Sequence, residues 1–99
     1  MNVDLRPEAS GDLVSTAAYF NNKRDGWGDH FLDSLEADLV DLEREASIHK
    51  LRFGLQCKLA KVFPFAIYYR IESSAAVVYA ILSCRMNPDT HRSILSERG

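Results

Sequence analysis

The sequence lacks any long apolar run. No stretch of its 99 residues approaches the roughly 20 consecutive apolar residues that a membrane-spanning helix needs. The first ten residues, MNVDLRPEAS, also lack the basic segment and apolar core of a secretory signal. These absences argue against a membrane or exported protein, and we expect the chain to be cytoplasmic.

The sequence has only two cysteines and none of the common ligand-binding motifs. The two cysteines, Cys57 and Cys84, form no CxxC pair and fall within predicted strands, so we expect buried free thiols. There is no GxGxxG phosphate-binding loop, no P-loop, no HExxH zinc motif and no GxSxG elbow. The three histidines lie far apart along the chain. We therefore expect no nucleotide, metal or other cofactor.

Charge is unevenly divided between the two halves of the chain. The net charge is −2, but residues 1–49 hold 11 acidic and 4 basic side chains, whereas residues 50–99 hold 3 acidic and 8 basic ones. The apolar fraction of 46% and the charged fraction of 26% are ordinary for one globular domain, which we place at residues 1–99. The uneven charge indicates either two partner-binding faces or simply solvated helix surfaces.

Two adjacent apolar segments dominate the second half. Residues 62–71 and 75–83 are rich in β-branched and aromatic side chains and flank the polar triplet Glu72-Ser73-Ser74, which predicts a β-hairpin at the centre of a sheet. Because side chains alternate along a strand, the odd-numbered residues of the first segment should face a core. The even-numbered ones, Arg70 among them, should lie on a free face that carries function.

Two helices should cover the core side of this hairpin. Apolar residues recur at intervals of three or four from Ala9 to Phe20 and again from Phe31 to Ala46, which is the spacing of an amphipathic helix. The first helix should end near Asn22 and the second near Ser47. The short connection between them predicts an antiparallel helical hairpin.

Shorter elements complete the predicted fold. We expect a first strand at residues 2–6 and a half-buried strand at residues 55–60. Asn87-Pro88 has the form of an N-cap followed by proline at the first position of a short C-terminal helix. The predicted order is β-α-α-β-β-β-α, an α+β fold in which the helical hairpin packs on one face of an antiparallel sheet.

Three segments of the sequence resemble those of a known family. The strings GWGDHFLDSLEADLVDL at residues 26–42, FPFAIYYRIE at 63–72 and VVYAILSCRMNP at 77–88 are similar, in this order, to segments of the RelE/ParE superfamily. Its members are toxins of bacterial type II toxin–antitoxin modules, also called plasmid stabilisation proteins. The resemblance is closer to the ParE branch, which implies a RelE/ParE-like fold, a cognate antitoxin and growth inhibition by binding DNA gyrase. The alternative is the RelE branch, which cleaves mRNA on the ribosome.

The resemblance also implies roles for individual residues. In a metal-independent nuclease, arginines would offset the charge of the phosphate transition state and a histidine would transfer protons, which assigns catalysis to Arg70, Arg85 and His91. In a gyrase inhibitor the same kind of side chains would bind the target instead. The residues implied for target binding are Lys58, Lys61, Arg85, Asn87, Arg92 and Arg98.

The antitoxin would fold onto exposed apolar parts of the helical hairpin, with Trp27 as an anchor. Each assignment has a structural alternative. Lys58 and Lys61 would be ordinary solvent-facing cations, Arg70 would pair with a nearby carboxylate, and Trp27 would belong to the core. A degenerate member that retains only antitoxin binding is a third interpretation of the whole chain.

Overall fold

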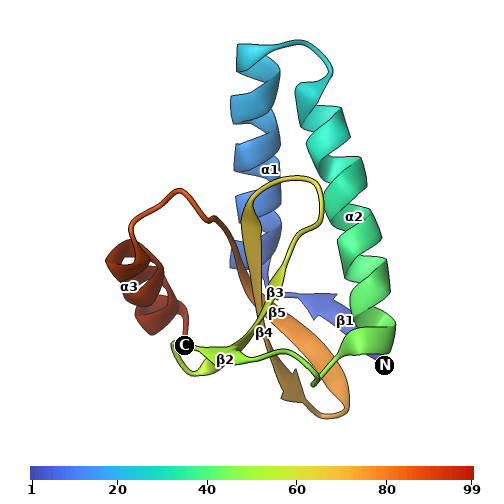
Figure 1. Cartoon of the computed structure of the whole chain (residues 1–99), viewed down its shortest axis with the longest axis vertical. Helices are drawn as coiled ribbons and strands as arrows, with labels where there is room; N and C mark the ends of the chain where they lie inside the picture. Colours follow the sequence, from blue (N-terminus) through green and yellow to red (C-terminus); the bar gives the residue numbers. More distant parts are fainter.

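A computed structural model describes residues 1–99, and its sheet is built around the predicted hairpin (Figure 1). The five strands lie in the order β1-β5-β4-β3-β2, so the β4–β5 hairpin is central, as predicted. The elements along the chain are β1 (Asn2–Leu5), α1 (Pro7–Lys23), α2 (Trp27–Glu45), β2 (Leu51–Arg52), β3 (Leu55–Leu59), β4 (Phe65–Glu72), β5 (Ala75–Ser83) and α3 (Pro88–Arg98).

The sheet differs from the prediction in two respects. β1 runs parallel to β5, with Val3 opposite Ala76, so the sheet is mixed rather than antiparallel throughout. The long connection through both helices allows this, since parallel neighbours need a crossover rather than a tight turn. The second difference is β2, which pairs with β3 through a turn at Phe53 and Gly54, both at positive φ. A two-residue strand is too short to show an alternating pattern.

The predicted first strand of the hairpin also begins three residues later than expected. Pro64 has no N–H to donate, which is poorly compatible with a central strand. Instead the chain bends, and the N–H of Phe65 donates to the carbonyl of Phe63 at 2.8 Å. This bend places Phe63 against the helices, where it lines the groove described below.

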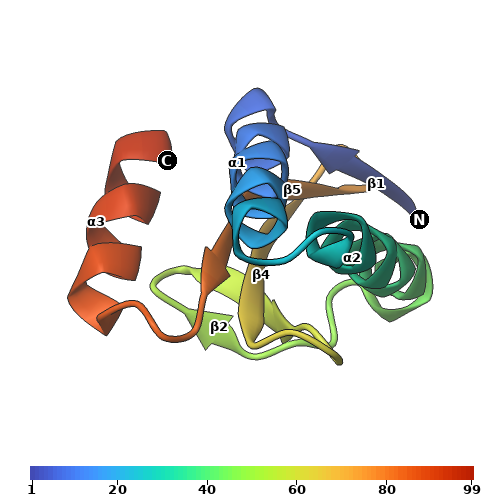
Figure 2. The ribbon, with the colours of Figure 1, turned by 90° about the horizontal axis from the view of Figure 1, so that it is seen from above.

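The helical hairpin packs on one face of the sheet, and Figure 2 shows α1 and α2 side by side with α3 standing apart. Phe31 and Leu35 of α2 are fully buried against Phe65, Ile67 and Tyr69 of β4. The prediction that the odd-numbered residues of this strand face a core is therefore confirmed.

The opposite face of the sheet is not free, contrary to the prediction. Ala66 and Tyr68 of β4 are fully buried and form a second core cluster with Leu55, Leu82 and Leu95. Leu95 belongs to α3, which covers this face. The sequence of α3 has too few apolar residues to show a clear stripe, so its coverage of the sheet could not be inferred from periodicity.

Gly28 of α2 packs tightly against α1. Its N–H donates to Oδ1 of Asn21 at 2.8 Å, and a Cβ atom built at this position would lie 2.3 Å from the carbonyl oxygen of Ala17. No side chain fits in that space. Gly26, just before α2, has φ of 85°, a left-handed conformation that favours glycine. Gly28 therefore allows α1 and α2 to pack closely, and Gly26 allows the turn that joins them.

Replacing Gly28 with alanine should lower the free energy of unfolding by about 1–3 kcal/mol, because overpacking outweighs the gain of about 1 kcal/mol in helix propensity. Gly11→Ala is the matched control, since Gly11 is exposed within α1 and a Cβ atom there would contact nothing within 4 Å. It should stabilise the protein by about 1 kcal/mol. Urea unfolding followed by circular dichroism measures both changes, and stabilisation by both substitutions would contradict the packing described.

Candidate functional site

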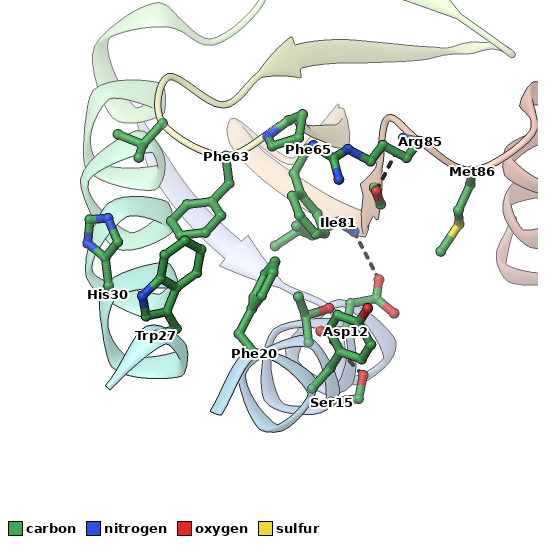
Figure 3. Close-up of a pocket in the computed structure, with 15 residues that line it drawn as sticks. Asp12, Ser15, Phe20, Trp27, His30, Phe63, Phe65, Ile81, Arg85 and Met86 are labelled. Atoms are coloured by element: carbon green, nitrogen blue, oxygen red, sulfur yellow. Dashed lines mark hydrogen bonds between the residues drawn. The ribbon is translucent and has the colours of Figure 1, made fainter. Parts of the chain in front are cut away.

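A groove of about 800 Å³ opens between α1, the β3–β4 connection and the end of β5 (Figure 3). At one end the rings of Phe20, Trp27 and Phe63 lie with their centres 5.2–6.4 Å apart. Arg85 and Met86 lie at the other end. Eight of the fifteen lining residues are hydrophobic, which suits an apolar segment better than a small polar substrate.

Large apolar side chains remain exposed around this groove. The exposed fractions are 57% for Tyr19, 40% for Trp27, 61% for Val62 and 40% for Met86. A gathering of exposed apolar side chains next to a groove is typical of a protein-binding surface. Trp27 thus lies where a partner could reach it, although its ring also packs against Phe20.

Asp12 lies on the wall of the groove and ties three elements together. Its carboxylate accepts hydrogen bonds from the guanidinium of Arg98 at 2.6 and 2.9 Å, and another from the N–H of Ile81 at 2.9 Å. β1 pairs with β5 only as far as Val78, so on the side away from β4 the N–H of Ile81 has no strand partner, and Asp12 accepts its hydrogen bond instead. Arg98 also donates to the carbonyl of Tyr79, and its pairing with Asp12 raises the pKa of Arg98. The end of α3 is therefore fixed to both α1 and β5.

His91, the predicted proton-transfer residue, is only 1% exposed between α3 and the sheet. Nδ1 lies 2.8 Å from Oη of Tyr68, and Nε2 lies 2.7 Å from the carbonyl oxygen of Ser83. Because a carbonyl only accepts, Nε2 carries a proton, and in the neutral tautomer with that proton Nδ1 accepts from the tyrosine. Burial raises the pKa of Tyr68 to about 12, which keeps that hydroxyl protonated. Both ring nitrogens are used inside the fold.

The other predicted site residues of the hairpin and α3 are exposed. Arg85 is exposed at the groove, and Arg70 is exposed on β4. Arg92 is exposed on α3, 3.1 Å from the carboxylate of Asp89. Asn87 caps α3 by accepting the N–H of Asp89 at 2.8 Å, as its position before proline predicted. The structure thus leaves Arg70, Arg85 and Arg92 accessible.

Lys58 and Lys61 both pair with carboxylates of α2. Lys58 is 5% exposed and forms an ion pair with Glu45, whereas Lys61 is exposed and lies 2.6 Å from the carboxylate of Asp41. Hydrogen bonds from these lysines lower the pKa of Glu45 and of Asp41. The interpretation of Lys58 as a solvent-facing cation is wrong, because α2 lies over this part of β3.

A polar network extends from Lys58 to residues that no sequence pattern indicated. Nδ1 of His49 lies 2.5 Å from Oη of Tyr69, and Nε2 lies 3.6 Å from the carboxylate of Glu45. The Tyr69 hydroxyl also accepts the N–H of Ser47 at 3.1 Å. Burial and the charge of Lys58 lower the pKa of His49. These residues hold the connection after α2 in place, and their wide spacing in sequence hides the arrangement.

Neither the cysteines nor the possible metal ligands form a reactive centre. Cys57 is half-buried in β3, but Cys84 is exposed just after β5, so the prediction of two buried thiols is wrong for Cys84. Burial raises the pKa of the Cys57 thiol, and partial desolvation by neighbouring groups raises that of the exposed Cys84, which disfavours the reactive thiolate at both positions. No three His, Cys, Asp or Glu side chains are arranged to hold a metal ion. None of the three helices has the length and apolar character required to span a bilayer.

Comparison with known proteins identifies the fold. No protein-family model matches the sequence, and no curated protein matches it. Among solved structures, the chain is similar to a chain of the chromosomal ParDE TA (toxin–antitoxin) system from P. aeruginosa, with a TM-score of 0.64 and 11% identity over 84% of this chain and 95% of that one. The predicted RelE/ParE-like α+β fold is therefore confirmed, and at this identity the similarity concerns the fold alone.

The network around His49 predicts a pH-dependent stability. Because folding lowers the pKa of His49, the unfolded chain binds a proton at higher pH than the folded one. The free energy of unfolding should therefore fall as the pH drops from about 7 to about 5, a window that brackets the ordinary histidine pKa of about 6.5. The lowered pKa values of Asp41 and Glu45 act only at more acidic pH.

Urea titrations at several pH values measure this slope. His49→Gln should flatten it, whereas His30→Gln, at an exposed position on α2, should leave it as in the wild type. A slope that survives His49→Gln unchanged would show that another group produces it.

Proposed function

We propose that this chain is the toxin of a type II toxin–antitoxin pair, and that it arrests bacterial growth by binding DNA gyrase without cleaving a bond. The observation that carries the proposal is the fold shared with a chain of a ParDE TA system. The segments at residues 63–72 and 77–88, which resemble the ParE branch, form the central hairpin of that fold. The proposed site of action is the cytoplasm, where gyrase acts.

The proposed antitoxin site is the groove. Its aromatic end presents Trp27 and Phe63, and large aromatic side chains are enriched among the residues that dominate binding energy. A disordered antitoxin segment that folds on binding can cover such an exposed apolar surface. This supports Trp27 as an antitoxin contact rather than a purely structural core residue.

The proposed target-binding surface is the accessible part of the β5–α3 region. Arg85, Asn87 and Arg92 are exposed there, and cations at such a surface speed and orient association with an acidic partner. Lys61 is accessible on another side of the molecule, next to α2. Lys58 and Arg98 are tied to internal carboxylates, so in this proposal they support the surface rather than contact the target.

A binding mechanism is favoured over RNA cleavage by the state of His91. A nuclease needs a base within hydrogen-bonding reach of the reacting hydroxyl. Both ring nitrogens of His91 are already bonded to Tyr68 and Ser83 beneath α3. RelE-type cleavage through Arg70, Arg85 and His91 would require α3 to move first.

Induction of the chain alone in a bacterial host tests the proposal directly. We expect growth arrest accompanied by DNA breaks, altered plasmid supercoiling and an SOS response, because gyrase poisoning leaves cleaved DNA. Arrest with new codon-phased 5′ ends on mRNA would overturn the gyrase mechanism in favour of RelE-type cleavage. Normal growth at full expression would contradict the proposed toxicity and support a chain that only binds an antitoxin.

Charge-reversal variants test the surface. Arg85→Glu should abolish the arrest, because it places an acidic group where the target is proposed to meet a cation. Arg44→Glu is the matched control, since Arg44 is exposed at the end of α2 and pairs with Asp41. His91→Gln should retain the arrest provided that thermal unfolding shows a folded protein, and its loss in a folded variant would argue for catalysis.

A further inference from the structure

Three cations stand at the rim of the groove without an acidic partner. Lys23 lies 5.3 Å from the ring centre of Tyr19, and Arg24 lies 5.6 Å from that of Trp27, and both rings line the groove. Arg85 lines the opposite end (Figure 3). None of the three cations is within ion-pair distance of a carboxylate. Their charges are available to a ligand in the groove.

Asp12 is the one carboxylate among the lining residues, and Arg98 already neutralises it. The guanidinium donates to both oxygens of Asp12, and the N–H of Ile81 donates to one of them as well. Arg98 comes from the far end of α3 and is not itself a lining residue. A ligand that enters the groove therefore meets positive charge at the rim and a carboxylate whose charge is offset.

We propose that the groove selects an amphipathic segment whose carboxylates bind the rim cations, and that Arg98 sets this preference by neutralising Asp12. The apolar side of the segment would fill the space beside Phe20, Trp27 and Phe63. Its acidic side chains would meet Arg85 at one end and Lys23 or Arg24 at the other. This inference rests on the proposed function for its assumption that the occupant is a segment of a protein partner.

The net charge of the molecule would by itself disfavour an acidic ligand, so a preference for one tests the role of the local charges. The chain carries a net charge of −2, so unspecific attraction would favour a basic ligand over an acidic one. A groove that prefers an acidic segment must do so through local charges. Arg85 and the Asp12–Arg98 pair are the groups that produce this local difference.

Two matched peptides of about 18 residues, long enough to form a helix, test the charge preference. Both carry the same leucine and phenylalanine residues at helical spacing and no tryptophan, and their polar positions are all Glu in one and all Lys in the other. Trp27 is the only tryptophan of the chain and lines the groove, so its fluorescence reports binding. We expect the Glu peptide to bind roughly tenfold more tightly. Equal binding, or tighter binding of the Lys peptide, would overturn the proposal.

Variants then test the role of Arg98. Arg98→Gln leaves the charge of Asp12 uncompensated, so the preference for the Glu peptide should shrink to about equal binding or reverse. The double variant Asp12→Asn/Arg98→Gln removes both charges and should restore the preference. A purely structural role for Arg98 would not produce that recovery. Arg44→Gln removes a cation outside the groove and should change neither affinity.

Arg85→Gln provides a second test that does not depend on the stability of the Arg98 variants. This substitution should weaken binding of the Glu peptide, whereas binding of the Lys peptide should stay the same or become tighter. An unaltered ratio of the two affinities would contradict the proposal. These titrations use the purified chain. A chain that binds the Glu peptide but does not arrest growth would refute the proposed toxicity while leaving the charge preference intact.

Discussion

The hydrogen bonds of Asp12 are the contacts on which the arrangement of this molecule depends. One carboxylate from α1 satisfies a backbone donor on the open edge of β5 and also binds the terminal arginine of α3. Without it, a buried N–H would lose its partner, and the end of α3 would lose its ion pair with α1 and keep only the weaker hydrogen bonds of Arg98 with Tyr79 and Arg6. The groove wall formed by α1 and the helix α3 on the second sheet face are therefore held together by the same carboxylate.

Most of the fold could be predicted from local patterns. The hairpin, both long helices and the cap at Asn87 each produce a signal within a few neighbouring residues, either as alternation, helical spacing or a residue pair. The parallel pairing of β1 and the burial of Tyr68 could not be predicted in that way. Both depend on contacts between segments far apart in sequence, and α3 is held mainly by single polar side chains rather than by an apolar stripe.

The candidate site was predictable only in part, and for the same reason. Trp27 and Arg85 were identified by residue type, and they are accessible at opposite ends of the groove. Lys58 and Arg98 were identified in the same way, but each is paired with a carboxylate brought in by a helix. A sequence shows which side chains are charged, whereas their partners, and hence their availability to a target, follow from the packed structure. Asp12 and His49 gave no signal for this reason.

The proposed binding mechanism requires that α3 stays docked, with His91 covered, while a partner occupies the groove on the other side of β5. Hydrogen exchange at individual amides tests this account most directly. In Asp12→Ala, the protection of the Ile81 amide and of the α3 amides should fall together, because the Asp12 carboxylate binds both β5 and α3. The amides of α2 should keep their protection. Undiminished protection of α3 in that variant would show that Asp12 does not hold it, and would contradict the account.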